Sequence, residues 1–126
     1  EATVPQTSKP KPASRFRDKD IHFDFDEYAL KPESRITLKA YADLLRKKNE
    51  YEVRIEGHCD ERGTSEYNLA LGQRRAEEAM NYLVTLGIDA ERIRTISYGE
   101  EMPVDSRSSE EARAKNRRDH FLLTQP

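Results

Sequence analysis

Two hydrophobic periodicities alternate along this chain, and their order restricts the fold more than any other feature of the sequence. An apolar/polar alternation, expected of a strand with one buried face, covers residues 21–26 and returns at Tyr51, Val53 and Ile55. An apolar spacing of three and four residues, expected of amphipathic helices, follows each of these segments. Because each early strand is followed by a helix, the crossovers between strands should be right-handed.

The first strand and the first helix are predicted in some detail. In residues 21–26 the buried face should consist of Ile21, Phe23 and Phe25. Pro32 should open the helix, and Lys47 and Lys48 suit its C-terminal end. The apolar stripe of this helix is predicted to contain Ile36, Ala40, Tyr41, Leu44 and Leu45.

The second half of the chain continues the same alternation. Thr64 or Ser65 should cap a longer helix that ends at Gly87, and its stripe comprises Leu69, Gly72, Ala76, Ala79, Met80 and Leu83. Further on, the pattern predicts a turn capped by Asp89, a strand through Ile96 and Tyr98, a polar loop at 99–109, a short helix at 110–116 and a strand at 118–124. The resulting order βαβαβ(α)β predicts an α+β fold, a two-layer α/β sandwich with helices on one face of a small mixed four-stranded sheet.

Composition limits the class of protein. A chain of 126 residues is long enough to bury one core and too short for several domains; 37% of its residues are charged and 35% are hydrophobic. The chain contains no apolar run near the roughly 20 residues that a membrane-spanning helix needs. A net charge of -2 argues against general binding of nucleic acid, which depends on a basic excess. The basic cluster of Arg113, Lys115, Arg117 and Arg118 is better explained as a solvated helix end followed by a strand.

Residues 1–19 differ in composition from the rest. They hold three of the six prolines, and five Lys or Arg against two acidic residues, which predicts a flexible linker able to act as a tether. The folded domain should therefore comprise residues 20–126. The first residues, Glu1 and Ala2, show no signal-peptide pattern, as expected of a mature or trimmed terminus.

The loop after the second strand concentrates reactive side chains, from His58 through Cys59, Asp60 and Glu61 to Arg62. A metal site is disfavoured because adjacent side chains point in alternating directions and do not converge on one ion. A thiol-dependent enzyme using Cys59 and His58 is the alternative function, although adjacency in sequence does not provide the geometry of a thiolate and its base. As the sole cysteine, Cys59 forms no intramolecular disulfide and is expected to pack as a small residue under the loop.

Two neighbouring arginines in the longer helix are expected to have different environments. At 100° per residue, Arg75 falls at the edge of the apolar stripe near Asn68, whereas Arg74 falls opposite the stripe, in solvent. Two interpretations of Arg75 remain open: a salt bridge to Asp60 or another acid of the loop, and a ligand site. A carboxylate and a guanidinium a few ångströms apart suit the ammonium and carboxylate of a zwitterionic amino acid.

Five segments carry a family resemblance over residues 20–124. They are Phe23–Asp26, Gly57–Thr64, Glu66–Ala76, Ser97–Glu100 and Lys115–Arg118. In the same order and spacing, they closely resemble the OmpA-like C-terminal domain family, and within it the peptidoglycan-associated lipoproteins of Gram-negative bacteria.

The resemblance implies a non-catalytic periplasmic domain without cofactor or metal, which binds the diaminopimelate of the peptidoglycan stem peptide and tethers the outer membrane to the cell wall. By motif position, Asp60 would bind the ammonium and Arg75 the carboxylate, while Asn68 would order the loop and the helix start. The remaining implied ligand-binding residues are Phe25, Asp26, Leu71 and Arg118.

The resemblance also implies partners and a location. The Tol system's β-propeller protein, TolB, would bind an overlapping surface, and the protein would lie at the periplasmic face of the outer membrane. The lipidated cysteine of such proteins is absent here and is expected upstream of Glu1. A second departure is Cys59, at a position where the family usually has Ala or Thr.

Overall fold

The computed structural model describes residues 19–125 and contains one four-stranded mixed sheet with strand order β1-β4-β2-β3. Strands β2 and β3 are parallel, and β4 runs antiparallel to both β1 and β2. In chain order the elements are β1 (Ile21–His22), α1 (Pro32–Lys47), β2 (Glu52–His58), α2 (Ser65–Thr85), a short 3₁₀ helix (Ala90–Arg92), β3 (Ile93–Gly99), α3 (Glu110–Asn116) and β4 (Arg118–Thr124). The predicted α+β class is confirmed. The predicted linker at 1–19 lies outside the described residues, apart from Lys19.

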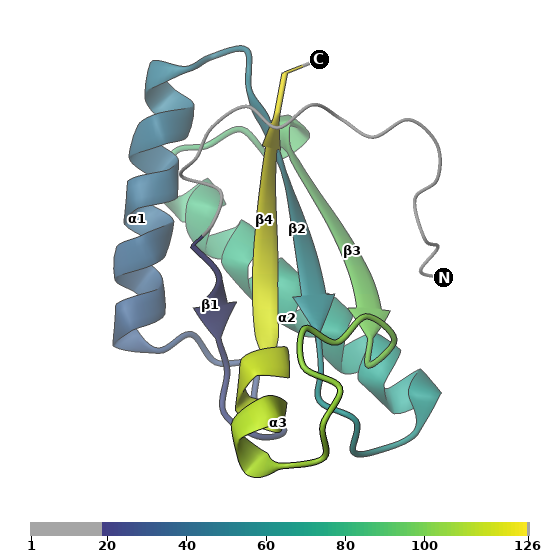
Figure 1. Cartoon of the computed structure of the whole chain (residues 1–126). Coiled ribbons are helices and arrows are strands. Elements are labelled where there is room, and N and C mark those ends of the chain that lie inside the picture. The colour runs from purple at the N-terminus through teal and green to yellow at the C-terminus, as the bar shows by residue number, and fades with distance from the viewer. Residues whose placement is uncertain (1–18, 126) are drawn as a thin grey trace.

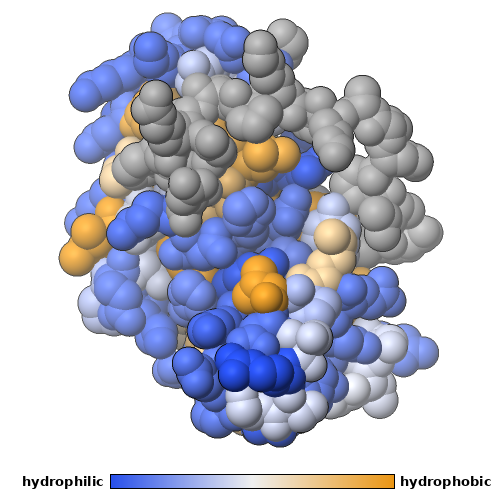
Figure 2. Space-filling model, in the orientation of Figure 1, coloured by the Kyte–Doolittle hydropathy of each residue, from blue (hydrophilic) through white to orange (hydrophobic). Residues whose placement is uncertain are grey.

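The core lies between the sheet and the two long helices. In Figure 1, α2 crosses behind the strands and α1 lies beside the β1 edge, while β4 occupies the middle of the sheet. Alternation along β2 turns Val53 and Ile55 into the core, whereas Arg54 and Glu56 face the other way. Figure 2 shows the face of the sheet without the long helices, and its visible part is mostly hydrophilic. None of the helices in residues 19–125 has the length and apolar content to cross a bilayer.

Helix α1 begins at Pro32 as predicted, but its buried face differs from the predicted stripe. The side chains that enter the core are Leu38, Tyr41, Ala42 and Leu45, whereas Ile36 is 69% exposed. Ile36 lies two positions before Leu38, which places it about 200° around the helix and away from the core. The inclusion of Ile36 in the buried stripe was therefore wrong.

The first strand is much shorter than the alternation predicts. Only Ile21 and His22 pair with β4, and after Phe23 the chain turns away from the sheet. The Glu27 amide donates to the carbonyl of Asp24 at 3.1 Å, and Asp26 has a left-handed φ of 60°. Phe25 is consequently 52% exposed, and its predicted burial was wrong. This turn, residues 24–27, carries Phe25 toward the start of α2.

Helix α2 lies directly against β2 because two glycines meet there. A Cβ atom on Gly57 would lie 1.8 Å from the carbonyl oxygen of Gly72, so no larger residue fits at this crossing. The helix is capped by Thr64, whose Oγ1 accepts from the Tyr67 amide at 3.1 Å, as one of the two predicted caps. The close crossing places the loop after β2 beside the first three turns of α2.

Candidate functional site

An open pocket of about 400 Å³ lies where three segments meet: the turn 24–27, the loop after β2 and the start of α2. Its walls combine aromatic, aliphatic and charged side chains on a largely apolar surface. The lining residues are Phe25, Asp26, Cys59, Asp60, Arg62, Gly63, Thr64, Tyr67, Asn68, Leu71 and Arg75. Six of the seven predicted ligand-binding residues thus lie around one pocket, and the exception is Arg118.

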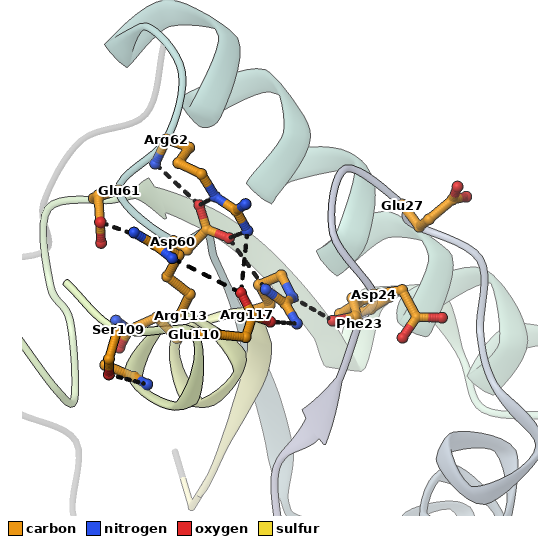
Figure 3. Close-up of polar contacts among 12 residues, drawn as sticks. Phe23, Asp24, Glu27, Asp60, Glu61, Arg62, Ser109, Glu110, Arg113 and Arg117 are labelled. Carbon is orange, nitrogen blue, oxygen red and sulfur yellow. Dashed lines mark hydrogen bonds and ion pairs between the residues drawn. The ribbon is translucent and has the colours of Figure 1, made fainter. Parts of the chain in front are cut away.

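Asp60 forms the anionic end of the pocket. Its residue is only 4% exposed, and its carboxylate accepts hydrogen bonds from the Arg62 backbone and side chain and from Arg117. Figure 3 shows this carboxylate between the guanidinium groups of Arg62 and Arg117. Burial on its own would raise the pKa of Asp60, but the hydrogen bonds from Arg62 and Arg117 outweigh it and lower the pKa below its ordinary value. Asp60 is therefore ionised at neutral pH.

Arg117 was not among the predicted site residues, yet its side chain donates a hydrogen bond to the Asp60 carboxylate. Its Nη1 lies 3.3 Å from Oδ2 of Asp60, while its Nε donates to the carbonyl of Phe23 at 2.9 Å and its Nη2 to Glu110 at 3.2 Å. No local pattern reveals this role, because it depends on how α3 and β4 pack against the loop after β2.

Arg118, which the family motif had assigned to the site, is not among the pocket-lining residues. It is 6% exposed, and its Nε lies 3.5 Å from Asp20 Oδ2. Burial lowers the pKa of its guanidinium. The neighbouring Arg117, just before β4, contacts Asp60 instead.

Arg75 is one of the most deeply buried side chains, at 1% exposure, although it borders the pocket. Its Nε, Nη1 and Nη2 donate to the carbonyls of Glu27 (2.8 Å), His58 (3.0 Å) and Asp24 (3.1 Å), respectively. These bonds connect the turn 24–27, β2 and α2. Among residues 19–125, the ion pairs of Asp60 are with Arg62 and Arg117 and not with Arg75, so the predicted salt bridge between Asp60 and Arg75 does not form. A guanidinium has five N–H groups, and three of those of Arg75 donate to carbonyls.

Arg74 differs from its neighbour as the helical spacing predicts. Its side chain is 51% exposed, and Nη2 lies 3.8 Å from Glu78. The guanidinium also lies 4.1 Å from the ring centroid of Tyr28. Two adjacent arginines therefore occupy a core position and a surface position.

Asn68 holds the loop against the helix start. Its Nδ2 donates to the carbonyl of Arg62 at 3.0 Å and to Glu100 Oε1 at 2.9 Å, and the residue is 1% exposed. The backbone carbonyl of Asn68 accepts a hydrogen bond from the Cys59 thiol at 3.2 Å. Asn68 thus contacts both the loop and the residue that follows β3, and the contribution of Glu100 was not predicted.

The apolar rim of the pocket comes from the turn 24–27 and from α2. The guanidinium carbon of Arg62 lies 3.8 Å from the ring centroid of Phe25, and Tyr67 donates its hydroxyl to Asp26. Leu71 faces the pocket from the next turn of α2. The exposed Phe25 side chain thus lines the pocket instead of the core, because the chain leaves the sheet after Phe23.

The alternative site at Cys59 and His58 lacks the geometry of a thiol nucleophile. Cys59 is 3% exposed and burial raises its pKa to about 11, so the thiol is protonated at neutral pH. His58 Nε2 lies 3.4 Å from Glu56 Oε1, and burial lowers the pKa of His58. Cys59 packs under the loop, as expected, and these two side chains do not form an oriented pair.

The arrangement as a whole presents opposite charges at one apolar pocket. The Asp60 carboxylate and the Arg75 guanidinium both border it, and Phe25, Tyr67 and Leu71 supply apolar surface. Charge-assisted hydrogen bonds of both signs recognise the two ends of a zwitterion. This set of groups is suited to binding and contains no activated nucleophile among the lining residues.

Several known proteins are similar to this chain in sequence. Residues 22–117 match the model of the OmpA family. The chain is 45% identical over 98 residues to the peptidoglycan-associated lipoprotein of Brucella melitensis, covering 78% of this chain and 58% of that protein. It is 46% identical over 98 residues to that of Haemophilus influenzae, covering 78% of this chain and 64% of that protein. The chain thus spans less than two thirds of the length of these relatives.

Solved structures show the same fold. The crystal structure of the peptidoglycan-associated lipoprotein from Burkholderia pseudomallei superposes with a TM-score of 0.83 at 37% identity, covering 85% of this chain and 91% of that one. The C-terminal domain of Helicobacter pylori MotB superposes with a TM-score of 0.79 at 20% identity, covering 86% and 85% of the two chains, and this likeness concerns the fold alone.

Proposed function

The chain belongs to the OmpA family, and on that premise we propose that its pocket binds the free amino-acid end of diaminopimelate in the peptidoglycan stem peptide. Asp60 receives the ammonium group and Arg75 the carboxylate. The observation that carries the proposal is that this buried, ionised carboxylate and this guanidinium border one open pocket. The domain acts by binding and performs no catalysis.

The remaining pocket residues have supporting roles. Asn68 fixes the loop that carries Asp60 by binding the carbonyl of Arg62. The turn with Phe25 and Asp26 offers backbone hydrogen-bonding groups and an aromatic wall, and Leu71 completes the apolar surface. Arg118 is not required to contact the ligand in this proposal, because it does not border the pocket.

The location of the domain follows from the same premise. The relatives are named lipoproteins, and this chain spans about half to two thirds of their length. We propose that a lipid anchor upstream of Glu1 attaches the protein to the periplasmic face of the outer membrane, with residues 1–19 as the tether. TolB, the β-propeller protein of the Tol system, is the proposed protein partner.

The site needs only modest affinity for this role. A charge-assisted hydrogen bond contributes about 1.5 to 3 kcal/mol before ordering costs, so two such contacts give weak to moderate binding. Many anchored copies face one polymeric cell wall, and the resulting effective concentration makes modest single-site affinity sufficient.

Pull-down with purified sacculi tests the proposal. Asp60→Ala and Arg75→Ala should each abolish retention, whereas Arg74→Ala should bind like the unaltered protein. Arg74 is the matched control, because it is adjacent to Arg75 but half exposed and outside the pocket. Equal losses at both arginines would instead indicate unspecific charge attraction, and circular dichroism must show that each variant is folded.

A further inference from the structure

The Asp60 carboxylate has no free acceptor position for a ligand. Its Oδ1 accepts from the backbone N–H of Arg62 at 3.0 Å and from Nε of Arg62 at 3.3 Å. Its Oδ2 accepts from Nη2 of Arg62 at 2.9 Å and from Nη1 of Arg117 at 3.3 Å. A carboxylate offers about four acceptor positions, so an ammonium group reaches Asp60 only if one of these donors leaves.

Two of the three donating groups are fixed by the fold. The side chain of Arg117 is 9% exposed and also binds the Phe23 carbonyl and Glu110. The backbone of Arg62 is held because its carbonyl accepts from Asn68 Nδ2 at 3.0 Å. Neither group can withdraw without disturbing the loop.

The side chain of Arg62 is different. It is 37% exposed, lies over the Phe25 ring and lines the pocket. Glu110 Oε1 lies 3.8 Å from its Nη2 and is itself largely exposed, so an alternative anionic partner is already adjacent. Arg62 can therefore move away from Asp60 while keeping a favourable electrostatic environment.

We propose that Arg62 is an internal competitor for the ligand: in the free protein its guanidinium occupies the place on Asp60 that the ligand's ammonium takes in the complex. This inference rests on the proposed function of the pocket and identifies the residue that controls access to its anionic end. Binding exchanges the Asp60–Arg62 side-chain pair for an Asp60–ammonium pair, with Arg117 unchanged beneath.

The exchange gives the pocket selectivity for cationic ligands. A ligand with an ammonium group replaces the donors that Asp60 loses, whereas a ligand without one would leave a buried carboxylate short of partners. Ligands that lack the ammonium therefore leave the Asp60–Arg62 pair closed. On this account Arg62 lowers the affinity of the pocket and restricts it to ligands that carry an ammonium group.

The test is a titration of the stem tripeptide L-Ala-γ-D-Glu-meso-diaminopimelate into the unaltered protein and into Arg62→Ala, with dissociation constants from amide chemical shifts. Removal of the competitor should tighten binding by about threefold to tenfold. The analogue peptide with 2-aminopimelate, which lacks the distal ammonium, should show no such gain.

Arg107→Ala is a matched control. Arg107 makes the same three contacts with Asp105, through its backbone N at 3.1 Å, Nε at 2.9 Å and Nη2 at 2.6 Å, and it does not border the pocket. The Arg107→Ala variant loses the same charge from a similar Asp–Arg pair, so the dissociation constant of the tripeptide should be the same for this variant as for the unaltered protein.

A second measurement needs no variant. The Nε–H signal of Arg62 should be protected from solvent exchange in the free protein and lose this protection at saturation with the tripeptide. Two results would overturn the inference and leave the proposed function standing. In the first, the unaltered protein binds the tripeptide and Arg62→Ala binds it equally or more weakly. In the second, the Nε–H of Arg62 stays protected at saturation. A tripeptide that does not bind the unaltered protein would overturn both.

Discussion

Arg117 supports Asp60 from a position 57 residues away in the chain, with its Nη1 3.3 Å from Oδ2 of the carboxylate. The contact joins the end of α3 to the loop after β2 at the base of the pocket. Arg62 has the larger effect in lowering the pKa of Asp60, and Arg117 adds to it. Because Arg117 also fixes the orientation of the carboxylate in the folded protein, binding of the proposed ligand would not have to order this side chain.

Replacement of Arg117 should therefore affect both stability and the site. Arg117→Met keeps much of the apolar stem but removes the donors to Asp60 and to the Phe23 carbonyl. Loss of buried charge-assisted hydrogen bonds should lower the free energy of unfolding by about 2 to 4 kcal/mol and raise the pKa of Asp60. Urea unfolding and carbon-detected titration of Asp60 check both effects, and an unchanged pKa would show that Arg62 alone sets it.

The contact between Gly57 and Gly72 should tolerate no side chain. Gly57→Ala places a Cβ against the Gly72 carbonyl and forces β2 and α2 apart, which should cost about 3 kcal/mol or more. Gly87→Ala is the control, since its φ of 98° strains an alanine but nothing lies within 4 Å of the new Cβ, and it should cost only about 1 to 2 kcal/mol. Urea midpoints rank the two variants, and equal losses would show that the crossing can relax.

Asp119 should make the protein less stable as the pH rises. It is fully buried on β4 and neither carboxylate oxygen has a hydrogen-bond partner among the described residues. Burial raises its pKa well above 3.8, against the opposing effect of Arg75. The protonated Asp119 therefore makes its full contribution to the free energy of unfolding below the pKa of the unfolded state. This contribution is lost as the pH rises from that pKa to the higher pKa of the folded state.

Asp119→Asn isolates this contribution because asparagine does not titrate. The difference in unfolding free energy between the variant and the unaltered protein should change with pH above about pH 4, in favour of the variant, by at least about 1 kcal/mol at neutral pH. Urea unfolding from pH 4 to 8 measures it. A difference that is flat across this range would mean that Asp119 titrates normally in the folded protein.

Cys59 should be unreactive in the folded domain. Its pKa of about 11 and its burial leave little accessible thiolate at neutral pH. Ellman's reagent should therefore modify Cys59 in the native protein only as fast as the domain opens to expose it, and rapidly once urea unfolds the domain. Fast modification without denaturant would reopen the thiol-dependent alternative.

Periodicity in the sequence predicts most elements because each depends on local spacing. The bounds of α3 and β4 agree with the predicted segments at 110–116 and 118–124, and the Thr64 cap and the α2 helix are confirmed. The failures at Ile36 and Phe25 have tertiary causes. Which face of α1 meets the core depends on how the helix packs against the sheet. The chain leaves the sheet after Phe23 because of the turn at Asp24, whose carbonyl accepts a hydrogen bond from Arg75.

The site divides in the same way. Asp60, Asn68 and Arg75 lie in recognisable motifs, and all three line one pocket. Arg117 and Glu100 escape sequence reasoning because each reaches the site from a distant element. The side-chain pair of Arg62 and Asp60, on which the proposed competition with a ligand rests, is equally invisible in the sequence, where the two residues are simply neighbours in a charged loop.

The most direct test of the account is a titration of the diaminopimelate stem tripeptide followed by amide chemical shifts of the whole domain. We expect saturable shifts concentrated in the loop from Gly57 to Gly63, in the turn 24–27 and at the start of α2, all lost in Asp60→Ala. The absence of saturable shifts, or shifts centred on another surface and unaffected by that substitution, would contradict the proposed binding of the cell-wall peptide.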